Sequence, residues 1–318
     1  MLAMKSRNQT IDILRVIGLF LVIAAHCSFS SEFYEFREFD VVLLVFCSGA
    51  SFALSSKNEP YWNYVKKRFK KLILPVWIFL CAFFPIHYLI GQPVTLKMIV
   101  ATFLFTSSGL LFVWIFRIIF VNAFCNPWIK KITEHSKYVF LMGLGIILVN
   151  DGLHYLASQV LTGKVLTLYE YIVSYTVGYG VISMYGMYGF FESEKKKCIV
   201  AIVSFTIFIG YYLMSNGSSL QTAKYPPMLY YISYGMFWSM MLSVIFNRIH
   251  LNEKVYAIIK WISIHSMTIY MWHMVFFYLL YDGVITGISN GFAMYIYILL
   301  ASLASTKITQ MMKDKWRK

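Results

Sequence analysis

An apolar stretch near the N-terminus contains an acid, a cation and an imidazole that can carry a proton: Asp12, Arg15 and His26. Ionisable groups are costly in hydrocarbon, so such side chains usually face a protein interior or a wet cavity. In a helix that turns about 100° per residue, Arg15 and His26 lie within roughly 20° of one face, about 16 Å apart along the axis. Leu19 and Val22 lie between them on the same stripe. We therefore expect the guanidinium and the imidazole to look into one shared passage. Asp12 precedes Arg15 by one turn, where the two can pair.

A second group of candidates is the basic stretch between Tyr64 and Pro75. Lys67 and Lys71 are one helical turn apart, and Arg68 is three residues before Lys71, so one helical end would present several cations. Such a cluster could hold a nucleotide or another phosphate-bearing ligand through charge-assisted hydrogen bonds. An ordinary basic loop attracted to anionic lipid is the alternative interpretation.

A second histidine, His273, lies deep in an apolar run, three residues after Tyr270. A single histidine in such a run is often a hydrogen-bonded packing residue. Its occurrence together with His26 favours one polar cavity that both side chains face.

The segment before the run 228–247 is rich in tyrosine. Tyr225 precedes a pair of prolines, and Tyr230 and Tyr231 follow it, which predicts an aromatic patch rich in hydroxyls. This patch is either an interfacial aromatic belt or a stacking surface for sugar rings.

The composition requires a membrane around these elements. The chain has 318 residues, of which 59% are hydrophobic and 13% charged, and its mean hydropathy is +0.65. A soluble domain carries about 25% charged residues, so this chain could not cover a globular surface in water. The sequence therefore predicts an all-α, polytopic membrane protein with a single domain over residues 1–318.

Ten apolar runs are long enough to cross a bilayer, which takes roughly 17 to 22 residues each. They lie at approximately 11–29, 40–56, 72–91, 107–125, 138–152, 168–190, 197–214, 228–247, 262–281 and 291–310. The fifth run is short and could be partly re-entrant, and residues 92–106 could form a half-buried loop helix. Ser48 and Gly49 in the second run predict a close contact between two helices.

The placement of basic residues sets the expected orientation. With the N-terminus inside, few of the 28 lysines and arginines fall in outer segments or inside the spans: Arg37, Lys97, Lys164 and Lys224 are outer, and Arg15 and Arg117 are within spans. Cytoplasmic loops carry the excess of basic residues, so both termini are expected in the cytoplasm. The net charge of +14 then reflects topology and not binding of nucleic acid.

Two further possibilities are disfavoured. A signal peptide would use Lys5 and Arg7 as its basic region, but no small-residue cleavage site follows the apolar stretch. The five cysteines are scattered and form no C-x-x-C pair, so the sequence indicates neither a zinc site nor a disulfide framework.

Four stretches carry a resemblance to a known family. They are Asp12-x-x-Arg15 with ten residues before His26, Phe46-x-Ser48-Gly49, Arg68-x-x-Lys71 followed by Pro75, and Ser266-x-x-Ile269-Tyr270-x-x-His273. Together they resemble the acyltransferase type 3 family of integral-membrane O-acyltransferases over nearly the whole chain, most specifically in the arginine–histidine spacing. Tyr225-Pro226-Pro227 is similar to members that act on bacterial surface polysaccharides. Lys71 stands where the family often has a second arginine, which keeps the charge but loses bidentate geometry.

The resemblance implies transfer of an acyl group, usually acetyl, from cytoplasmic acyl-CoA to a carbohydrate hydroxyl. The acceptor would be a capsular, exopolysaccharide or other cell-envelope glycan at a bacterial plasma membrane, and no metal is implied. His26 would be the general base or, alternatively, would carry the acyl group itself. Asp12 would hold Arg15 in place, and the separation of about 16 Å between Arg15 and His26 is comparable to an extended pantetheine arm.

The remaining candidates divide between donor and acceptor. Acetyl-CoA would be held by Arg15, Lys67, Arg68 and Lys71, and the acceptor sugar by Tyr225, Tyr230, Tyr270 and His273. The family often appends an extracytoplasmic hydrolase-like domain that this sequence lacks, so the membrane domain is expected to act alone or with a partner.

Two other functions remain open at this point. A glycan exporter or flippase of similar size could use the same cavity for passage, and a sensor or scaffold could keep the fold without turnover. Glycan accumulating inside cells that lack the chain would favour the exporter. Binding of acetyl-CoA without ester formation would favour the sensor.

Overall fold

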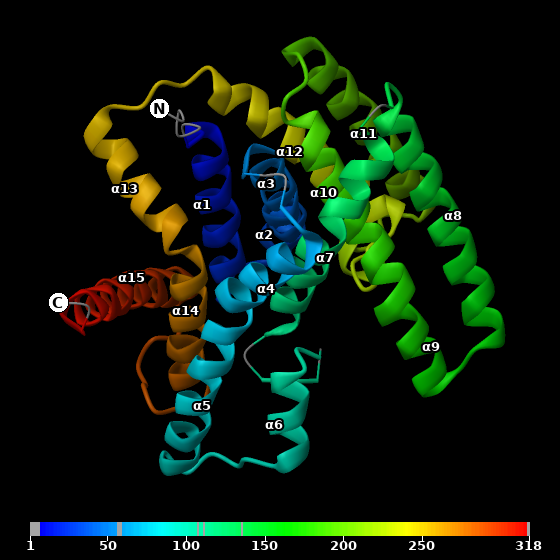
Figure 1. The fold of residues 1–318 in the computed structure, drawn as a ribbon. Coiled ribbons are helices and arrows are strands. Elements are labelled where there is room, and N and C mark those ends of the chain that lie inside the picture. The colour runs from blue at the N-terminus through cyan, green and yellow to red at the C-terminus, as the bar shows by residue number, and fades with distance from the viewer. Residues whose placement is uncertain (1–6, 56–58, 107, 111, 135, 317–318) are drawn as a thin grey trace.

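The computed structural model describes residues 7–55, 59–106, 108–110, 112–134 and 136–316, and Figure 1 shows its fold. Within those ranges the chain forms helices and no β-strand, which confirms the predicted all-α class. The elements are α1 (Gln9–Ala24), α2 (Ser31–Arg37), α3 (Asp40–Ser55), α4 (Tyr61–Leu72), α5 (Leu74–Leu89), α6 (Leu96–Phe103), α7 (Trp114–Thr133), α8 (Val139–Val160), α9 (Gly163–Tyr169), the π-helix η1 (Glu170–Ser174), α10 (Tyr175–Gly189), α11 (Glu194–Met214), the 3₁₀-helix η2 (Leu220–Ala223), α12 (Leu229–Asn247), α13 (Glu253–Ile264), α14 (Ser266–Tyr281) and α15 (Gly291–Trp316). Lys5, one of the two basic residues of the disfavoured signal peptide, lies outside the described ranges.

Seven helical stretches within the described residues are long and apolar enough to cross a membrane. They are Ser31–Ser55, Tyr61–Leu89, Val139–Val160, Gly163–Gly189, Glu194–Met214, Leu229–Asn247 and Gly291–Lys315. Three further predicted spans overlap α1, α7 and α14; α1 and α14 have only 16 residues each, and α7 carries Arg117, Lys130 and Lys131. The protein is therefore a multi-pass helical membrane protein, whereas ten crossings and cytoplasmic termini stay predictions.

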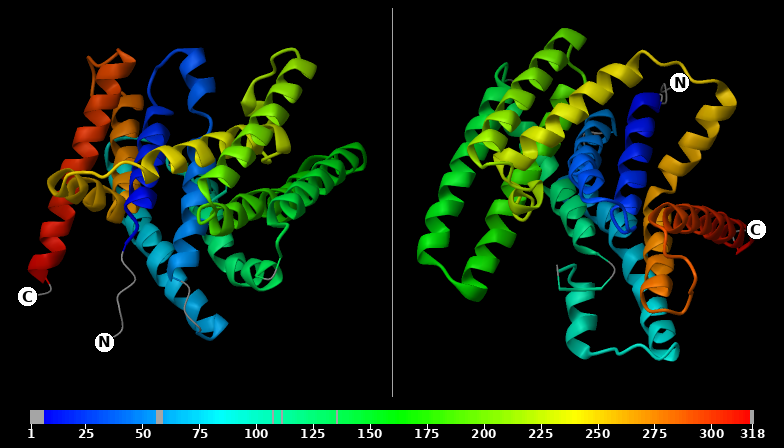
Figure 2. Two further views of the ribbon diagram at one scale, coloured as in Figure 1. Left: turned by 90° about the horizontal axis from the view of Figure 1, so that it is seen from above. Right: turned by 180° about the vertical axis from the view of Figure 1, so that it is seen from behind.

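Helix α1 lies at the centre of the bundle. The side chain of Asn8 accepts the Ile11 N–H at 3.1 Å and caps the start of the helix. Its apolar side chains are buried on several sides, with Leu14, Leu19 and Ile23 at most 2% exposed, because α3, α12, α13 and α14 all pack against it. In the left view of Figure 2, the start of α1 and the end of α15 lie on one side of the molecule, and α2 and the α14–α15 connection lie on the opposite side.

Helices α3 and α10 make a contact without intervening side chains. A Cβ atom added to Gly49 would lie 2.0 Å from the carbonyl oxygen of Ser183, and one added to Gly186 would lie 2.1 Å from that of Phe46. Small residues that allow backbones to approach are typical of helix contacts in membranes. The prediction of a packing site at Ser48-Gly49 is confirmed.

Replacing Gly49 by Ala should therefore destabilise the protein by about 1–3 kcal/mol, because the new methyl group must push two backbones apart. The same substitution at Gly145 is the matched control, since no described atom outside its own helical turn lies within 4 Å of an added Cβ there. Thermal unfolding of both variants in lipid nanodiscs measures the difference. Equal melting temperatures for the two variants would contradict the close contact.

The fifth predicted span, 138–152, is wrong in length, and its re-entrant alternative is wrong as well. Helix α8 runs unbroken for 22 residues, from Val139 to Val160. Polar residues near its middle ended the apolar run in the sequence, but Asn150 is only 3% exposed and Asp151 accepts the Leu229 N–H at 2.9 Å, at the start of α12. The helix therefore continues past these polar residues, and Asp151 joins it to α12. Residues 92–106 do contain a short helix, α6, as expected.

Candidate active site

A buried carboxylate organises the first turns of α1. Asp12 is 1% exposed and accepts hydrogen bonds from Arg7 Nε at 2.6 Å, from the Ser263 hydroxyl at 2.7 Å and from the Tyr256 hydroxyl at 3.1 Å. Arg15 Nη1 lies 3.6 Å from Asp12 Oδ1, which is the ion pair that the spacing predicted. The carboxylate therefore ties α1 to α13, the helix that carries Tyr256 and Ser263.

Arg15 is fixed by two hydroxyl groups as well as by Asp12. Its Nη1 donates to Ser263 Oγ at 2.9 Å, and its Nη2 donates to Ser51 Oγ at 2.6 Å. Ser51 in turn donates to the Cys47 carbonyl at 2.7 Å. The guanidinium thus joins α1, α3 and α13. Sequence reasoning missed both serines, because their proximity to Arg15 depends on how distant helices pack.

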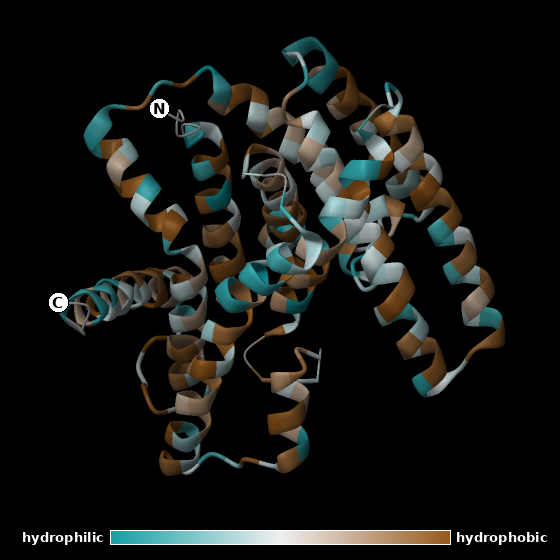
Figure 3. Ribbon diagram, viewed as in Figure 1, coloured by the Kyte–Doolittle hydropathy of each residue, from teal (hydrophilic) through white to brown (hydrophobic). Residues whose placement is uncertain are grey.

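The basic residues of α4 gather near this end of α1, and Figure 3 shows α4 as a hydrophilic helix. Arg68 lies over the ring of Tyr64 at 5.0 Å, and its Nη2 lies 3.5 Å from Ser55 Oγ. Lys71 is exposed and lies within electrostatic reach of Arg7, Arg15 and Arg68. The structure therefore brings together three of the four cations that the sequence selected.

Lys67 differs from the other cations of α4. Its side chain is 71% exposed and forms an ion pair with Glu59. A phosphate ligand would have to compete with that carboxylate, so Lys67 is the weakest of the predicted anion-binding residues.

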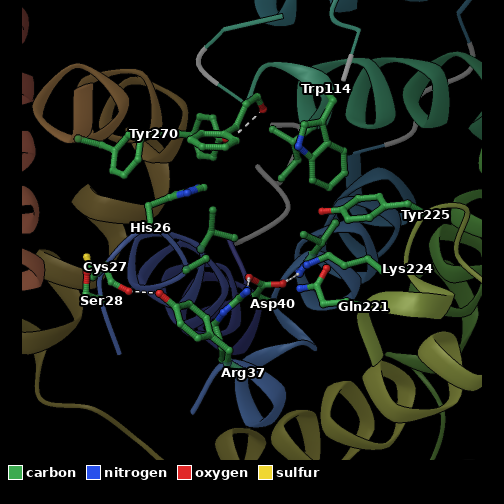
Figure 4. A pocket seen from close by; sticks show the side chains of 17 residues that line it. His26, Cys27, Ser28, Arg37, Asp40, Trp114, Gln221, Lys224, Tyr225 and Tyr270 are labelled. Atoms are coloured by element: carbon green, nitrogen blue, oxygen red, sulfur yellow. Dashed lines mark hydrogen bonds and ion pairs between the residues drawn. The ribbon is translucent and has the colours of Figure 1, made fainter. Parts of the chain in front are cut away.

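The opposite end of α1 opens into a cavity of about 400 Å³, drawn in Figure 4. Its walls come from the end of α1, from α2, from the start of α3, from residues 112–115 and 221–225, and from α14. Since α2 and residues 221–225 belong to the segments predicted as outer, the cavity lies on the predicted outer side. His26 and Tyr270 lie on one side of it, and Lys224 and Tyr225 on the other.

His26 is part of the cavity wall. Helix α1 ends at Ala24, so His26 lies in the turn that follows the helix, with its N–H bonded to the Ile23 carbonyl at 3.1 Å. Its ring stacks on Phe112 with centroids 4.0 Å apart and is tilted by 25° from it. This stacking fixes the plane of the imidazole. Phe112 was missed because it belongs to an irregular segment with a positive φ of 46°, which no periodic pattern reveals.

The prediction that His273 faces the cavity together with His26 is wrong, because His273 lies next to His26 but behind the cavity wall. The ring centroids are 5.5 Å apart, and His273 is completely buried. Its Nδ1 contacts the Tyr270 carbonyl, and its Nε2 has no hydrogen-bond partner among the described residues. Tyr270 does line the cavity and donates its hydroxyl to the Phe112 carbonyl at 3.1 Å.

The predicted patch of three tyrosines is divided by the start of α12. Tyr225 lines the cavity and packs edge-on against Trp114, with centroids 5.2 Å apart. Burial and the nearby carboxylates of Asp40 and Glu38 raise the pKa of Tyr225, which keeps its hydroxyl a donor.

Tyr230 and Tyr231 do not join Tyr225 at the cavity. Tyr230 is 6% exposed, donates to the Ser218 carbonyl at 2.8 Å and stacks on Phe208. Tyr231 is completely buried. A stacking surface made of all three tyrosines is therefore wrong, and of the three only Tyr225 lines the cavity.

Buried ion pairs that sequence reasoning missed lie at the far wall of the cavity. Arg37 pairs with Asp40 at 2.6 Å and with Glu38 at 2.8 Å, and Lys224 pairs with Glu38 at 2.7 Å. Gln221 also donates to Glu38. The available signal was the rarity of Arg37 and Lys224, two of the few basic residues in predicted outer segments.

The expected shared passage between Arg15 and His26 is wrong. The cavity reaches Val22, one turn before His26, and Arg15 is not among its lining residues. Leu19, the next side chain on the stripe, is 2% exposed and packed in the core. The polar cluster around Arg15 and the cavity at His26 are thus two ends of one helix, separated by packed side chains.

Comparisons with known proteins identify the family to which this chain belongs. The searches of curated proteins and of solved structures gave no match. A family model described as an acyltransferase domain matches residues 8–308, which include both ends of α1, α4 and α14. The chain therefore belongs to this acyltransferase family and is a multi-pass membrane acyltransferase.

Proposed function

We propose that the protein transfers an acetyl group from cytoplasmic acetyl-CoA to a hydroxyl of a capsular, exopolysaccharide or other cell-envelope sugar in a bacterial plasma membrane. The observation that supports this most is the position of His26. An oriented imidazole lines a cavity whose remaining wall carries carboxylate, guanidinium, amide and phenol groups. Such groups bind sugar hydroxyls through directional hydrogen bonds. A cavity of about 400 Å³ has the size of a small-molecule site.

In the proposed reaction His26 is the general base. The imidazole takes the proton of the acceptor hydroxyl while the oxygen forms a bond to the thioester carbonyl carbon. The carbon–sulfur bond then breaks, and the departing thiolate of CoA takes the proton back from the imidazolium. The stacking of His26 on Phe112 and its contact with His273 hold the ring in place for both proton transfers.

The cations at the other end of α1 would receive the phosphates of CoA. Arg68 and Lys71 on α4, together with Arg15, present positive charge at the end of α1 that the predicted orientation assigns to the cytoplasm, where the donor would arrive. Guanidinium groups suit phosphate oxygens because they donate two parallel hydrogen bonds. The thioester would then have to pass Leu19 to reach His26, so binding of the donor must open the packed segment between the two ends.

The test is acetylation of glycan in membranes that contain or lack this chain. Acetyl-CoA labelled with ¹³C in its acetyl group is added to inside-out vesicles, and NMR of the isolated glycan follows the acetyl signal. The proposal predicts labelled esters only when the chain is present, on glycan of normal length.

The same experiment distinguishes the other functions. Glycan accumulating on the cytoplasmic side in the absence of the chain would identify an exporter. Acetyl-CoA that binds without any ester being formed would identify a sensor and would contradict transfer.

A further inference from the structure

The cavity wall opposite His26 holds charged side chains that are almost completely buried. Arg37, Glu38, Asp40 and Lys224 are 4%, 0%, 1% and 3% exposed. Two are basic and two are acidic, so the group is neutral as a whole. Arg37, Asp40 and Lys224 line the cavity, and Glu38 contacts both bases without lining it.

Each cation in this group already has a carboxylate partner. Arg37 Nη1 donates to Asp40 Oδ2 at 2.6 Å, and its Nη2 donates to Glu38 Oε1 at 2.8 Å. Lys224 Nζ donates to Glu38 Oε2 at 2.7 Å. A ligand carboxylate or phosphate would add a third negative group to two paired cations, or would have to displace Glu38 or Asp40. An uncompensated charge at a buried site is costly, so both outcomes oppose an anionic ligand.

The wall still offers hydrogen bonds of both kinds. Asp40 accepts from Arg37 and from the Val41 N–H at 2.6 Å, and a carboxylate has about four acceptor sites, so acceptor capacity remains. Tyr225 lines the same wall with a hydroxyl that can donate. A sugar hydroxyl both donates and accepts, whereas a carboxylate only accepts and an ammonium only donates. The uncharged hydroxyl is therefore the group that fits beside Asp40 and Tyr225.

We propose that this wall selects an uncharged sugar as the acceptor and rejects sugars that carry a carboxylate or a phosphate. The inference rests on the proposed transfer to a sugar hydroxyl and narrows its acceptor class. Neutral hexoses, deoxyhexoses and N-acetylhexosamines meet the requirement, and uronic acids, sialic acids and sugar phosphates do not. Glu38 sets the selectivity, because its carboxylate neutralises both Arg37 and Lys224.

Binding of two matched disaccharides tests this selectivity without any catalysis. The full-length protein in lipid nanodiscs is titrated with cellobiose and with cellobiouronic acid, which differ only in a CH₂OH group replaced by a carboxylate. Fluorescence of Trp114, which lines the cavity, reports occupancy, and a Trp114→Phe variant identifies the part of the signal that arises there. Cellobiose should bind at least tenfold more tightly than the acid.

A Glu38→Gln variant provides the reverse experiment. Without the Glu38 carboxylate, the two positive charges of Arg37 and Lys224 face only the negative charge of Asp40. The binding preference of the variant should therefore shift at least tenfold toward the acid. If this variant fails to fold, the titration of the wild-type protein with the two disaccharides is a sufficient test. Equal or tighter binding of the acid by the wild-type protein, or binding of neither sugar, would overturn the inference. Acetyl transfer itself is tested separately, because labelled esters on glycan would support transfer even if the inferred selectivity were overturned.

Discussion

Replacing His26 by Phe should reduce acetyl transfer by about 10²–10⁴-fold while the protein stays folded, since general-base catalysis contributes on that order. Phenylalanine keeps an aromatic ring for stacking against Phe112 but has no nitrogen that can take a proton. The variant therefore separates the chemical role of the imidazole from its packing role. The measurement is the initial rate of labelled ester formation in vesicles, with thermal unfolding recorded on the same preparation.

His250→Ala is the matched control for this prediction. His250 is exposed in the connection between α12 and α13, so its loss should leave the rate unchanged. A His26→Phe protein that transfers acetyl at the wild-type rate would show that the imidazole is not the base. Loss of rate together with a large fall in melting temperature would indicate a packing role instead.

Replacing Arg15 by Ala should raise the KM for acetyl-CoA by about tenfold to a hundredfold. A hydrogen bond to a charged group contributes about 1.5–3 kcal/mol, and each 1.4 kcal/mol corresponds to a factor of ten. Arg15→Lys should recover only part of the affinity, because an ammonium cannot reach Ser51, Ser263 and a phosphate with a fixed fork of donors.

Lys66→Ala is the control for Arg15, because Lys66 is an exposed cation on α4 and so tests the effect of removing charge alone. Its KM should stay within twofold of the wild-type value. The assignment of Arg15 to the donor would be refuted by an unchanged KM in Arg15→Ala. Because Asp12 retains Arg7, Ser263 and Tyr256 as partners, the variant should still fold.

Local spacing predicted the parts of the site that lie within one helix. The Asp12–Arg15 ion pair depends only on an i,i+3 relation, and the structure contains it. The prediction that His26 and His273 face one polar cavity spans two helices and is only half right, since their rings are 5.5 Å apart but His273 is buried behind the cavity wall. The ion pair could be predicted because the spacing of neighbours along an α-helix is the same in every protein.

Contacts between distant segments could not be predicted in this way. Lys224 and Glu38 are separated by 186 positions, and nothing in either local pattern indicates the partner. Tyr230 was grouped with Tyr225 because the two are close in sequence, but the start of α12 at Leu229 turns Tyr230 toward α11. The prediction that Arg15 and His26 share one passage was wrong for a related reason. Helical spacing shows which residues of α1 lie on one face, but it does not show which residues of other helices cover that face.

The contact of α3 with α10 limits which helices can move relative to one another. Backbones that touch at Gly49 and Gly186 have no side-chain rotamers to rearrange, so α3 and α10 must move as one rigid unit. Helix α1 is bordered on other sides by α13 and α14, which are interrupted at His265, where the α-helical run ends and restarts. Displacement of the α13–α14 side would therefore widen the path of a thioester past Leu19 without disturbing the contact of α3 with α10.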